Sequence, residues 1–315
     1  MLSSEAGMDP RAVRQTAKAR LDALRASSRR FEAASADERW LGCCPAYRLA
    51  REQPPPESDV VVTDGLTWHV PKEDGDHGLA HRLREGWLPW HELLIQRVLG
   101  VGTAMIDVGA NVGTTSICRV VAGDMQRVYA IEPEPINFAC LVHNVVANGI
   151  AGFVLPDQCA IADVIGHAPL RRSSEIGNHA LMAPGAPGSR RKTISVPVST
   201  LDAWVDRHAI DRQAIGFIKV DTQGWEPQVL AGAPRLVAQA HTAWLMEVSP
   251  KHLANAGTSV QDLLARLAAS FSYAIDLRGD SRVLRIGDLS EALAYIGPGG
   301  RASYTNLLLY HGEPV

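Results

Sequence analysis

The stretch Met105-Ile-Asp-Val-Gly-Ala-Asn-Val-Gly113 decides the predicted fold, because a short apolar strand runs into a glycine turn and then into a helix. Strands and helices alternate from this point. Strands are predicted at 104–108, 127–131, 153–155 (with 160–161 near its continuation), 194–198, 215–220, 242–248, 273–277 and 306–310, and helices at 113–121, 135–147, 201–208, 227–240 and 260–269. Apolar strands separated by amphipathic helices are typical of a parallel sheet covered on both faces. The sequence therefore predicts a doubly wound α/β fold.

The residues before this region form a separate part of the pattern. Apolar residues recur at helical spacing over 9–52, and Pro54-Pro55-Pro56 ends that segment. We therefore predict an N-terminal helical extension over 1–55 and one domain over 56–315. The extension has a basic face, which we expect to be solvated or to pair two copies of the chain as a homodimer.

Two further elements are predicted at the start of the domain. A β-hairpin is expected over Val60–Val62 and Leu66–Val70, because Asp64-Gly65 is a typical hairpin turn. Trp87–Leu99 has a helical pattern that ends at Gly100. The low-complexity stretch Ala183–Arg191 is expected to be a loop.

Composition excludes several classes of protein. The 315 residues include 31 Lys and Arg and 34 Asp and Glu, and the net charge of -3 disfavours a nucleic-acid partner. No apolar run reaches the roughly 20 residues that span a bilayer, and no secretory signal is apparent, so we expect no membrane partner and a cytoplasmic location. The five cysteines have no CxxC spacing and are expected to be reduced thiols.

The glycine turn indicates the kind of ligand. Its spacing is GxxxG rather than the GxGxxG of a pyrophosphate-binding turn, and Gly109 and Gly113 let a backbone approach a ligand closely. Asp107 would repel a diphosphate but suits an ammonium group, which S-adenosylmethionine carries. Glu132 ends the second strand, where a carboxylate grips the ribose diol of NAD or S-adenosylmethionine. The two features together favour S-adenosylmethionine.

Acidic residues also end two later strands. Asp221 follows the strand 215–220 and Glu247 lies near the end of the next, so both are expected at the carboxyl edge of the sheet. They are predicted to act either as base and orienter or as two ligands of a divalent metal such as Mg²⁺. His179, in a loop, is a further catalytic candidate. We interpret Glu226 as an acid that complements a helix start.

Four motifs in this order closely resemble the FkbM family of S-adenosylmethionine-dependent methyltransferases: IDVGANVG, IEPEP, STLDAWV and IKVDTQGWEPQVLAGA. The resemblance extends from about Gly86 to Tyr310. It implies a Rossmann-like class I methyltransferase fold, a seven-stranded, mostly parallel sheet in which Asn306–Tyr310 is an inserted antiparallel strand.

The resemblance also implies positions for the cofactor. It assigns binding of S-adenosylmethionine to Asp107, Gly109, Asn111, Gly113 and Glu132. The stretch Asp157–Asp163 matches the turn that borders the adenine, which adds Ala160, with Cys159 in place of the usual polar residue. Trp225 is larger than many family members have at this position, and we expect it to shape the substrate pocket.

The predicted function is transfer of a methyl group to a hydroxyl of a small molecule such as a sugar, a polyketide or another specialised metabolite. Two alternatives stay open, a nicotinamide-dependent oxidoreductase and a non-catalytic cofactor-binding or scaffold protein. A nucleic-acid methyltransferase is disfavoured, because Asp-Thr-Gln-Gly follows the central strand where such enzymes have an Asn/Asp-Pro-Pro-Tyr loop. The pair His77 and His81 lacks a third ligand for a metal site.

Overall fold

The computed structural model describes residues 47, 50, 52–72, 78–88, 104–122, 125–182, 193–278, 283–297 and 302–312. They belong to two compact units: unit 1 draws on 1–98, 110–158 and 173–177, and unit 2 on 99–109, 159–172 and 178–315. Most of the predicted extension, the helix 87–99 from residue 89 onward and the loop 183–191 lie outside the described residues. Trp87 and Leu88 are described and are not helical. The boundary at residue 55 stays a prediction.

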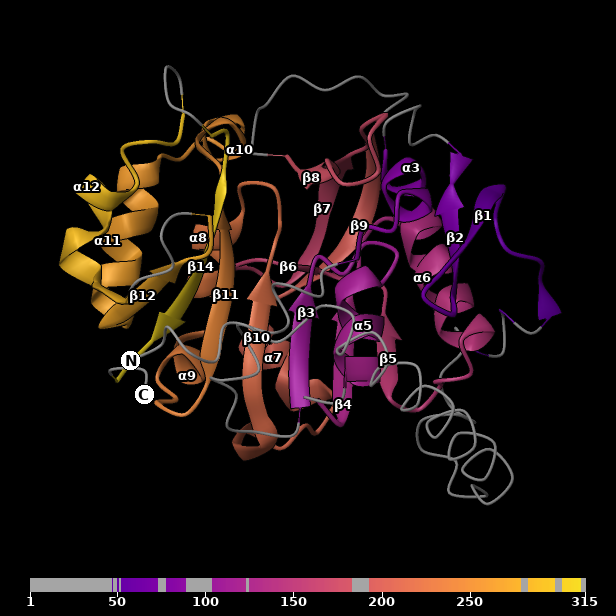
Figure 1. Ribbon diagram of the computed structural model, residues 1–315. Helices are drawn as coiled ribbons and strands as arrows, with labels where there is room; N and C mark the ends of the chain where they lie inside the picture. Colours follow the sequence, from indigo (N-terminus) through magenta and orange to yellow (C-terminus); the bar gives the residue numbers. More distant parts are fainter. Residues whose placement is uncertain are drawn as a thin grey trace. The chain divides into compact units, whose positions relative to one another are not determined.

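Unit 2 contains the strands that carry most of the candidate catalytic residues (Figure 1). Six of its strands follow one another in the order β13 (Val283–Arg285), β12 (Tyr273–Asp276), β14 (Thr305–Tyr310), β11 (Ala243–Val248), β10 (Ile215–Val220) and β3 (Ala104–Val108). The strands β3, β10 and β11 are parallel, whereas β14 runs antiparallel to both of its neighbours. The predicted inserted strand is therefore confirmed.

The helices of unit 2 are α7 (Leu201–Arg207), α8 (Glu226–Ala231), α9 (Pro234–Val237), α10 (Pro250–Asn255), α11 (Val260–Ser270) and α12 (Leu289–Ala292), with short 3-10 turns at η3 (Arg212–Ala214) and η4 (Ile286–Asp288). The prediction of one helix over 227–240 is wrong, because α8 and α9 are separate. Pro234 cannot continue a helix, since its ring removes a donor and collides with the preceding turn. At Gly232 an added Cβ would lie 2.1 Å from the carbonyl oxygen of Ala162, so only glycine fits the break.

A second sheet in unit 2 has the order β6 (Ala160–Ile161), β9 (Thr193–Ser199), β7 (Gly166–Arg171) and β8 (Ala180–Leu181). The sequence placed 194–198 among the parallel strands, but β9 pairs antiparallel with β7 in this separate sheet. Gly166 and Pro169 are unusual in a strand, which explains why β7 was not predicted. The inner face buries a small apolar cluster that includes Leu170 and Val198.

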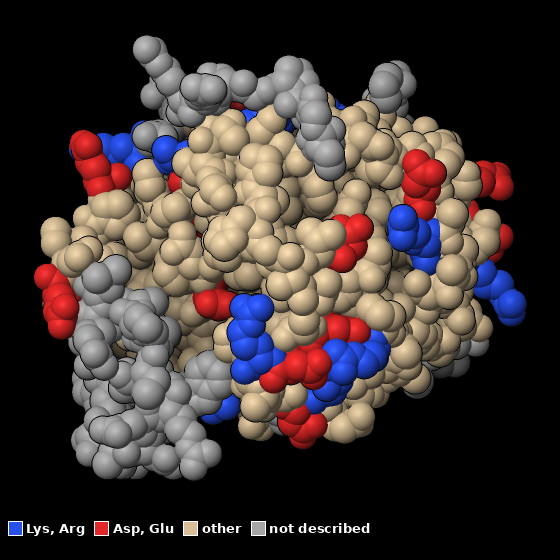
Figure 2. Space-filling view, turned by 180° about the vertical axis from the view of Figure 1, so that it is seen from behind, with Lys and Arg blue, Asp and Glu red and all other residues tan. Residues whose placement is uncertain are grey.

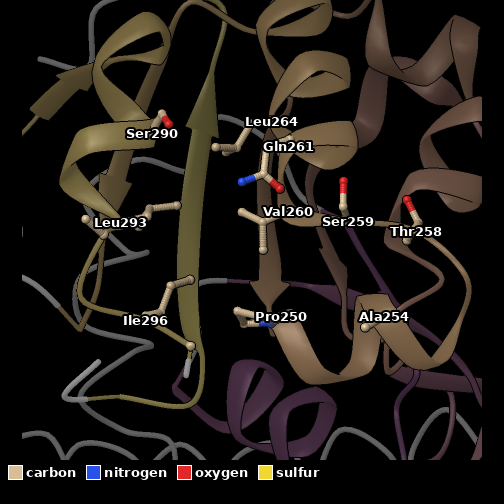
Figure 3. Close-up of a pocket in the computed structure, with 12 residues that line it drawn as sticks. Pro250, Ala254, Thr258, Ser259, Val260, Gln261, Leu264, Ser290, Leu293 and Ile296 are labelled. Carbon is tan, nitrogen blue, oxygen red and sulfur yellow. The ribbon is translucent and has the colours of Figure 1, made fainter. Parts of the chain in front are cut away.

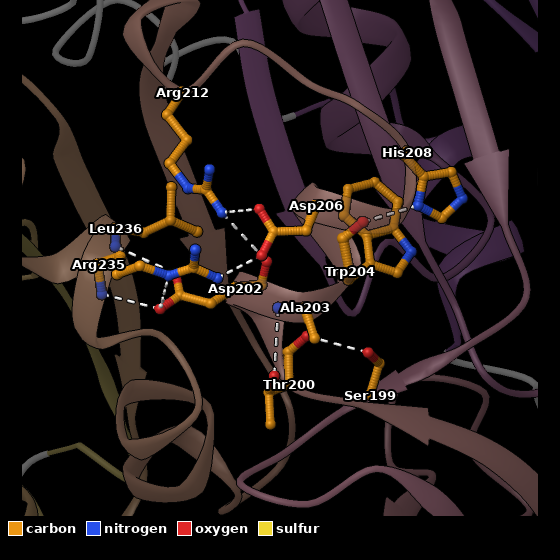
Figure 4. A network of polar contacts seen from close by, with 10 residues as sticks. All are labelled: Ser199, Thr200, Asp202, Ala203, Trp204, Asp206, His208, Arg212, Arg235 and Leu236. Carbon is orange, nitrogen blue, oxygen red and sulfur yellow. Dashed lines mark hydrogen bonds and ion pairs between the residues drawn. The ribbon is translucent and has the colours of Figure 1, made fainter.

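A polar network joins α7 to α9 (Figure 4). The carboxylate of Asp202 is buried and accepts hydrogen bonds from the backbone N–H groups of Arg235 at 2.8 Å and Leu236 at 3.2 Å. The side chain of Arg235 also contacts it, with Nε 3.3 Å from Oδ2. Since the first N–H groups of a helix have no partner within the helix, Asp202 satisfies two of them for α9.

Asp202→Ala is expected to lower the free energy of unfolding by about 2–4 kcal/mol, because the backbone N–H groups of Arg235 and of the buried Leu236 lose their acceptor. Urea unfolding followed by circular dichroism measures the change. Asp206→Ala is the matched control: this carboxylate pairs with Arg212 and Arg235 at the surface, where ion pairs contribute little. Equal losses in the two variants would contradict the assigned role of Asp202.

Unit 1 contains β4 (Arg127–Ile131), which pairs in parallel with β5 (Val154–Asp157), and the helices α5 (Thr114–Ala122) and α6 (Pro135–Ala147). It also contains α3 (Leu79–Arg84) and the hairpin of β1 (Ser58–Thr63) and β2 (Leu66–Pro71), which confirms the predicted hairpin. The turn residues Asp64 and Gly65 have φ angles of 50° and 78°, as a tight hairpin turn requires.

Asn144 of α6 and Asn148, which caps the end of this helix, bind the backbone of β2. Asn148 accepts from the N–H of Thr67 at 2.9 Å and donates to its carbonyl at 2.8 Å, and Asn144 does the same at His69. Asn144 also donates to the carbonyl of Val112 at 2.9 Å. Residues four apart lie on the same side of a helix, so both side chains reach β2. They make hydrogen bonds to its backbone of the kind that a neighbouring strand would make, and the bond from Asn144 to Val112 links the hairpin to the glycine turn.

The end of the predicted N-terminal helix packs on unit 1. Tyr47, Ala50 and Glu52 are helical, and the buried Tyr47 hydroxyl donates to the carbonyl of Val154.

Charged side chains of both signs lie beside one another on the face drawn in Figure 2. Among the described helices, none is long and apolar enough to span a bilayer.

Candidate functional site

The glycine turn after β3 packs directly against the turn after β10. The N–H of Asp221 donates to the carbonyl of Val108 at 3.0 Å. A Cβ at Gly109, where φ is +80°, would lie 1.9 Å from the carbonyl oxygen of Asp221. Gly109 was expected to admit a ligand, but the contact with Asp221 by itself requires glycine at this position.

An ion pair crosses from β10 to β3 beneath these turns. Lys219 and Asp107 are register partners, and the Lys219 Nζ lies 3.1 Å from the Oδ1 of the fully buried Asp107. The same ammonium donates to the carbonyl of Gly109 at 3.3 Å and lies 3.6 Å from the Oδ2 of Asp221. Lys219 therefore links both carboxylates. Sequence analysis missed it, although a lysine within an otherwise apolar strand is a readable signal.

Glu226 organises the turn that follows Asp221. Its Oε1 accepts from the N–H of Thr222 at 2.9 Å, from the Thr222 hydroxyl at 3.1 Å and from the N–H of Gly224 at 3.3 Å. The turn is tight, with φ angles of 57° at Gln223 and 105° at Gly224. The interpretation of Glu226 as a helix-start acid was incomplete, because the carboxylate binds the turn that carries the candidate catalytic residue.

Burial raises the pKa of Glu226 from its ordinary value near 4.5 to about 7, and the charges of Glu247 and Asp221 add to this shift. The neutral form is therefore the one that folding favours. As pH rises from about 4.5 to 7, ionisation of this buried carboxyl costs stability, and above that window the cost is constant.

Glu226→Gln is expected to raise the free energy of unfolding above neutral pH by on the order of 3 kcal/mol, because an amide keeps an acceptor for the turn and does not ionise. The advantage should shrink as pH falls and vanish below about 4.5. Urea unfolding at a series of pH values measures it, with the exposed Glu291→Gln as control. A difference that stays constant with pH would contradict the role of ionisation.

Glu247 lies at the end of the strand next to Asp221 and pairs with a histidine. The pairing of Val220 with Met246 places Asp221 and Glu247 at neighbouring strand ends, as predicted. The Nδ1 of His252, on α10, lies 3.2 Å from the Oε1 of Glu247. Burial and the charge of Asp221 raise the pKa of Glu247, and the hydrogen bond to Glu247 raises the pKa of His252.

Sequence analysis did not single out His252, because nothing in the local pattern of Pro250–Asn255 distinguishes it from a surface histidine. The structure gives it a role by packing. Its backbone carbonyl lies against Gly224, where an added Cβ would be 2.2 Å away. The charges of Glu226 and Asp221 also act on its imidazole. Three carboxylates, one lysine and one histidine thus meet around the carboxyl ends of β10 and β11.

The predicted role of Asp221 and Glu247 as ligands of a divalent metal finds no support in the part of the chain that the structure describes. Among the residues that the structure describes, no three or more His, Cys, Asp or Glu side chains form a group that could hold a metal ion. His81 is described, whereas His77 lies outside the described residues. The contact of Glu247 with His252 fits an orienting role for this carboxylate.

In unit 1, Glu132 holds the second half of the glycine turn. Its Oε2 accepts from the N–H of Asn111 at 2.9 Å and its Oε1 from the N–H of Glu134 at 2.9 Å. The N–H of Ala110 donates to the carbonyl of Ile131 at 3.0 Å. The strand end and the turn are therefore fixed to one another through backbone groups and one carboxylate.

Asn111 has the features of a ligand-binding residue. Its φ angle is +54°, in the left-handed region, and its side-chain Oδ1 is buried without a hydrogen-bond partner among the described residues. A buried acceptor in this state is rare, because it has lost its bonds to water. The nearby Gly113 has a φ of +88°, a backbone conformation that strains any residue with a Cβ.

Three other predicted residues lie in or next to the second sheet. The Ala160 side chain is buried in the apolar cluster, so a ligand could meet only its backbone. Trp225 packs against the same cluster and donates from Nε1 to the carbonyl of Leu181 at 2.9 Å. The second sheet therefore holds the indole by packing and by one hydrogen bond. The role of Trp225 in shaping the substrate pocket stays a prediction. His179 is half-buried just before β8.

Known proteins resemble this chain to different extents. A curated relative, the 31-O-demethyl-FK506 methyltransferase FkbM of Streptomyces tacrolimicus, is 27% identical over 44% of this chain and 66% of its own length. The crystal structure of a methyltransferase FkbM from Methylobacillus flagellatus KT is 20% identical, with a TM-score of 0.41, over 66% of this chain and 44% of that one. A structure of M. capricolum TrmK with S-adenosyl-homocysteine is 10% identical, with a TM-score of 0.36, over 71% of this chain and 69% of that one.

The chain thus spans just under two thirds of the curated relative and less than half of the solved FkbM structure. The family model of the methyltransferase FkbM domain matches residues 107–274. This segment contains the glycine turn, the strand ends and the second sheet, and the predicted Rossmann-like methyltransferase fold is confirmed. Because the matched segment is more than half of its 315 residues, the chain belongs to the FkbM methyltransferase family.

Proposed function

We propose that this protein is an S-adenosylmethionine-dependent O-methyltransferase that acts on a hydroxyl group of a small molecule. The observation that carries the proposal is the group of Asp221, Glu247 and His252 at the carboxyl ends of neighbouring parallel strands, where α/β enzymes place their chemistry. The name of the Streptomyces tacrolimicus relative specifies methylation at an oxygen atom, which supports the same reaction type.

The residues assigned to the cofactor fit it. Glu132 directly follows β4, and a carboxylate at the end of the second parallel strand is the group that accepts hydrogen bonds from the hydroxyls of a ribose. The buried Oδ1 of Asn111 offers an acceptor to a ligand donor. Asp107 has its charge compensated by Lys219, which holds this strand end in place. When bound, S-adenosylmethionine supplies the activated methyl group.

The chain's own contribution is to orient the acceptor hydroxyl and to take its proton. A base works best when its pKa lies near the working pH, and an imidazole meets this condition better than an ordinary carboxylate. Glu247 holds the Nδ1 side of His252, and we assign proton acceptance to the opposite nitrogen, Nε2. Asp221, with 34% of its side chain exposed, is positioned to accept a hydrogen bond from the hydroxyl.

Calorimetry with S-adenosylmethionine and S-adenosylhomocysteine tests the cofactor, and transfer of a tritiated methyl group to a panel of neutral alcohols, with 31-O-demethyl-FK506 among them, tests the reaction. Glu132→Ala should weaken cofactor binding at least tenfold, whereas the exposed Glu175→Ala should not. Absence of binding for both cofactor forms would overturn the proposal. Binding of NADH in their place would support the oxidoreductase alternative.

A further inference from the structure

The two strands beside the proposed base are open at one shared position. In β11 every residue is buried except Glu247, and in β14 every residue is buried except Asn306. These two residues are register partners across the antiparallel pair. The side chains of directly opposed residues lie on the same face of a sheet, with their Cβ atoms about 4.5–5.5 Å apart. Asn306 therefore lies beside the carboxylate that holds His252.

The amide of Asn306 is available to a ligand. The backbone carbonyl of this residue accepts from the N–H of Leu277 at 3.0 Å, whereas its side chain makes no hydrogen bond to another residue in the described part of the chain. The side chain is half-buried, and a carboxamide has both donors and an acceptor. It can therefore bind a hydroxyl or a carbonyl group.

A buried carboxylate fixes the start of β14. Asp276, at the end of β12, accepts a hydrogen bond from the hydroxyl of Thr305. Arg278 donates from Nη1 to the carbonyl of Tyr304 at 3.2 Å. The two residues before Asn306 are thus anchored on the end of the neighbouring strand, and this anchor holds the amide in place opposite Glu247.

The segment that follows α12 connects this anchor with α10. The hydroxyl of Tyr295 donates to Asp276 at 2.7 Å. The next residue, Ile296, lines a cavity together with Pro250 of α10 (Figure 3). At Gly297 an added Cβ would lie 3.4 Å from the Cγ of Pro250. One segment therefore packs against both the helix of the proposed base and the anchor of β14.

The charges at this edge of the sheet restrict what the amide can meet. Asp221 and Glu247 are acids at neighbouring strand ends, and the ammonium of Lys219 lies 3.1 Å from Asp107 and 3.6 Å from Asp221. The two acids would repel a phosphate or a carboxylate on the acceptor, whereas a neutral polar group meets no such repulsion.

We propose that Asn306 determines specificity by binding a second, neutral hydroxyl or carbonyl group of the acceptor, close to the hydroxyl that is methylated. The inference rests on the proposed function, because it describes how the acceptor of that reaction is held beside Glu247 and His252. The short separation of Asn306 and Glu247 requires the two groups to lie near one another. The preferred acceptor is therefore a diol or a hydroxyketone rather than an isolated alcohol.

NMR on the full-length, ¹⁵N-labelled protein with S-adenosylhomocysteine tests the assignment. The probes are trans-cyclohexane-1,2-diol, cyclohexanol and trans-2-hydroxycyclohexanecarboxylate, and the side-chain NH₂ signals of Asn306 are identified by their loss in Asn306→Leu. We expect the diol to shift these signals saturably. It should bind about three- to tenfold more tightly than cyclohexanol, the range for one neutral hydrogen bond, and also more tightly than the carboxylate.

Two variants localise the effect, with backbone amide signals as the measure of affinity. In Asn306→Leu, whose side chain has no hydrogen-bonding group, the diol and cyclohexanol should bind equally well. Asn255→Leu, exposed on α10, should keep the preference for the diol.

No saturable shift of the Asn306 signals, a preference for the diol that survives in Asn306→Leu, or carboxylate binding as tight as that of the diol would overturn the inference. Calorimetry with S-adenosylhomocysteine on the same samples verifies the fold and separates this failure from failure of the proposed function. If Asn306→Leu does not bind S-adenosylhomocysteine, Asn306→Ala takes its place.

Discussion

The Lys219→Met variant is expected to lose about 3–5 kcal/mol of its free energy of unfolding, the range for removing one partner of a buried ion pair. Asp107 is fully buried, and the side chain of Lys219 is 12% exposed, so the variant would take the ammonium away from a carboxylate in a place with little water. The carbonyl of Gly109 would lose a donor as well. Urea unfolding followed by fluorescence measures the loss.

A double variant separates the charge from the packing. Asp107→Asn combined with Lys219→Met removes both charges, and we expect it to recover more than half of the loss, because no uncompensated charge is then buried. The exposed Lys251→Met controls for loss of a lysine in itself. A single variant as stable as the wild type, or a double variant less stable than the single one, would show that the pair does not hold this strand end.

The His252→Ala variant is expected to transfer methyl groups about 10²–10⁴-fold more slowly than the wild type while it binds S-adenosylmethionine with nearly unchanged affinity. The lost group is the proposed proton acceptor, and none of the contacts described at the cofactor residues involves it. Turnover of the acceptor found in the alcohol panel measures the rate, and added imidazole should restore part of it.

The pH profile gives a second readout. A base must be unprotonated, so the wild-type rate should rise with pH through the pKa of His252, which its hydrogen bond to Glu247 holds above the ordinary value of 6.5. The variant should lack this rise. Its matched control is His179→Ala, which tests the other histidine candidate. A large loss of the methyl-transfer rate in His179→Ala, with none in His252→Ala, would show that His179 is the proton acceptor.

The course of the chain could be read from local pattern. The strands over 104–108, 127–131 and 215–220 and the helix over 135–147 have the predicted bounds, because each is an apolar or amphipathic run ended by a turn residue. The predicted elements were wrong where a proline or glycine conflicts with the pattern around it. Pro234 divided one predicted helix, and Gly166 and Pro169 concealed β7, because tertiary packing outweighs the weak strand preference of such residues.

The sequence by itself therefore determined the α/β class, the bounds of several strands and the acidic residues at their ends. Only the tertiary structure decided which of these residues meet. The Lys219–Asp107 pair joins residues 112 positions apart through strand register, and the Glu247–His252 pair depends on the angle at which α10 leaves β11. Periodicity records which face of an element is buried, but not which neighbour covers it, so partners of this kind appear only when the elements are packed.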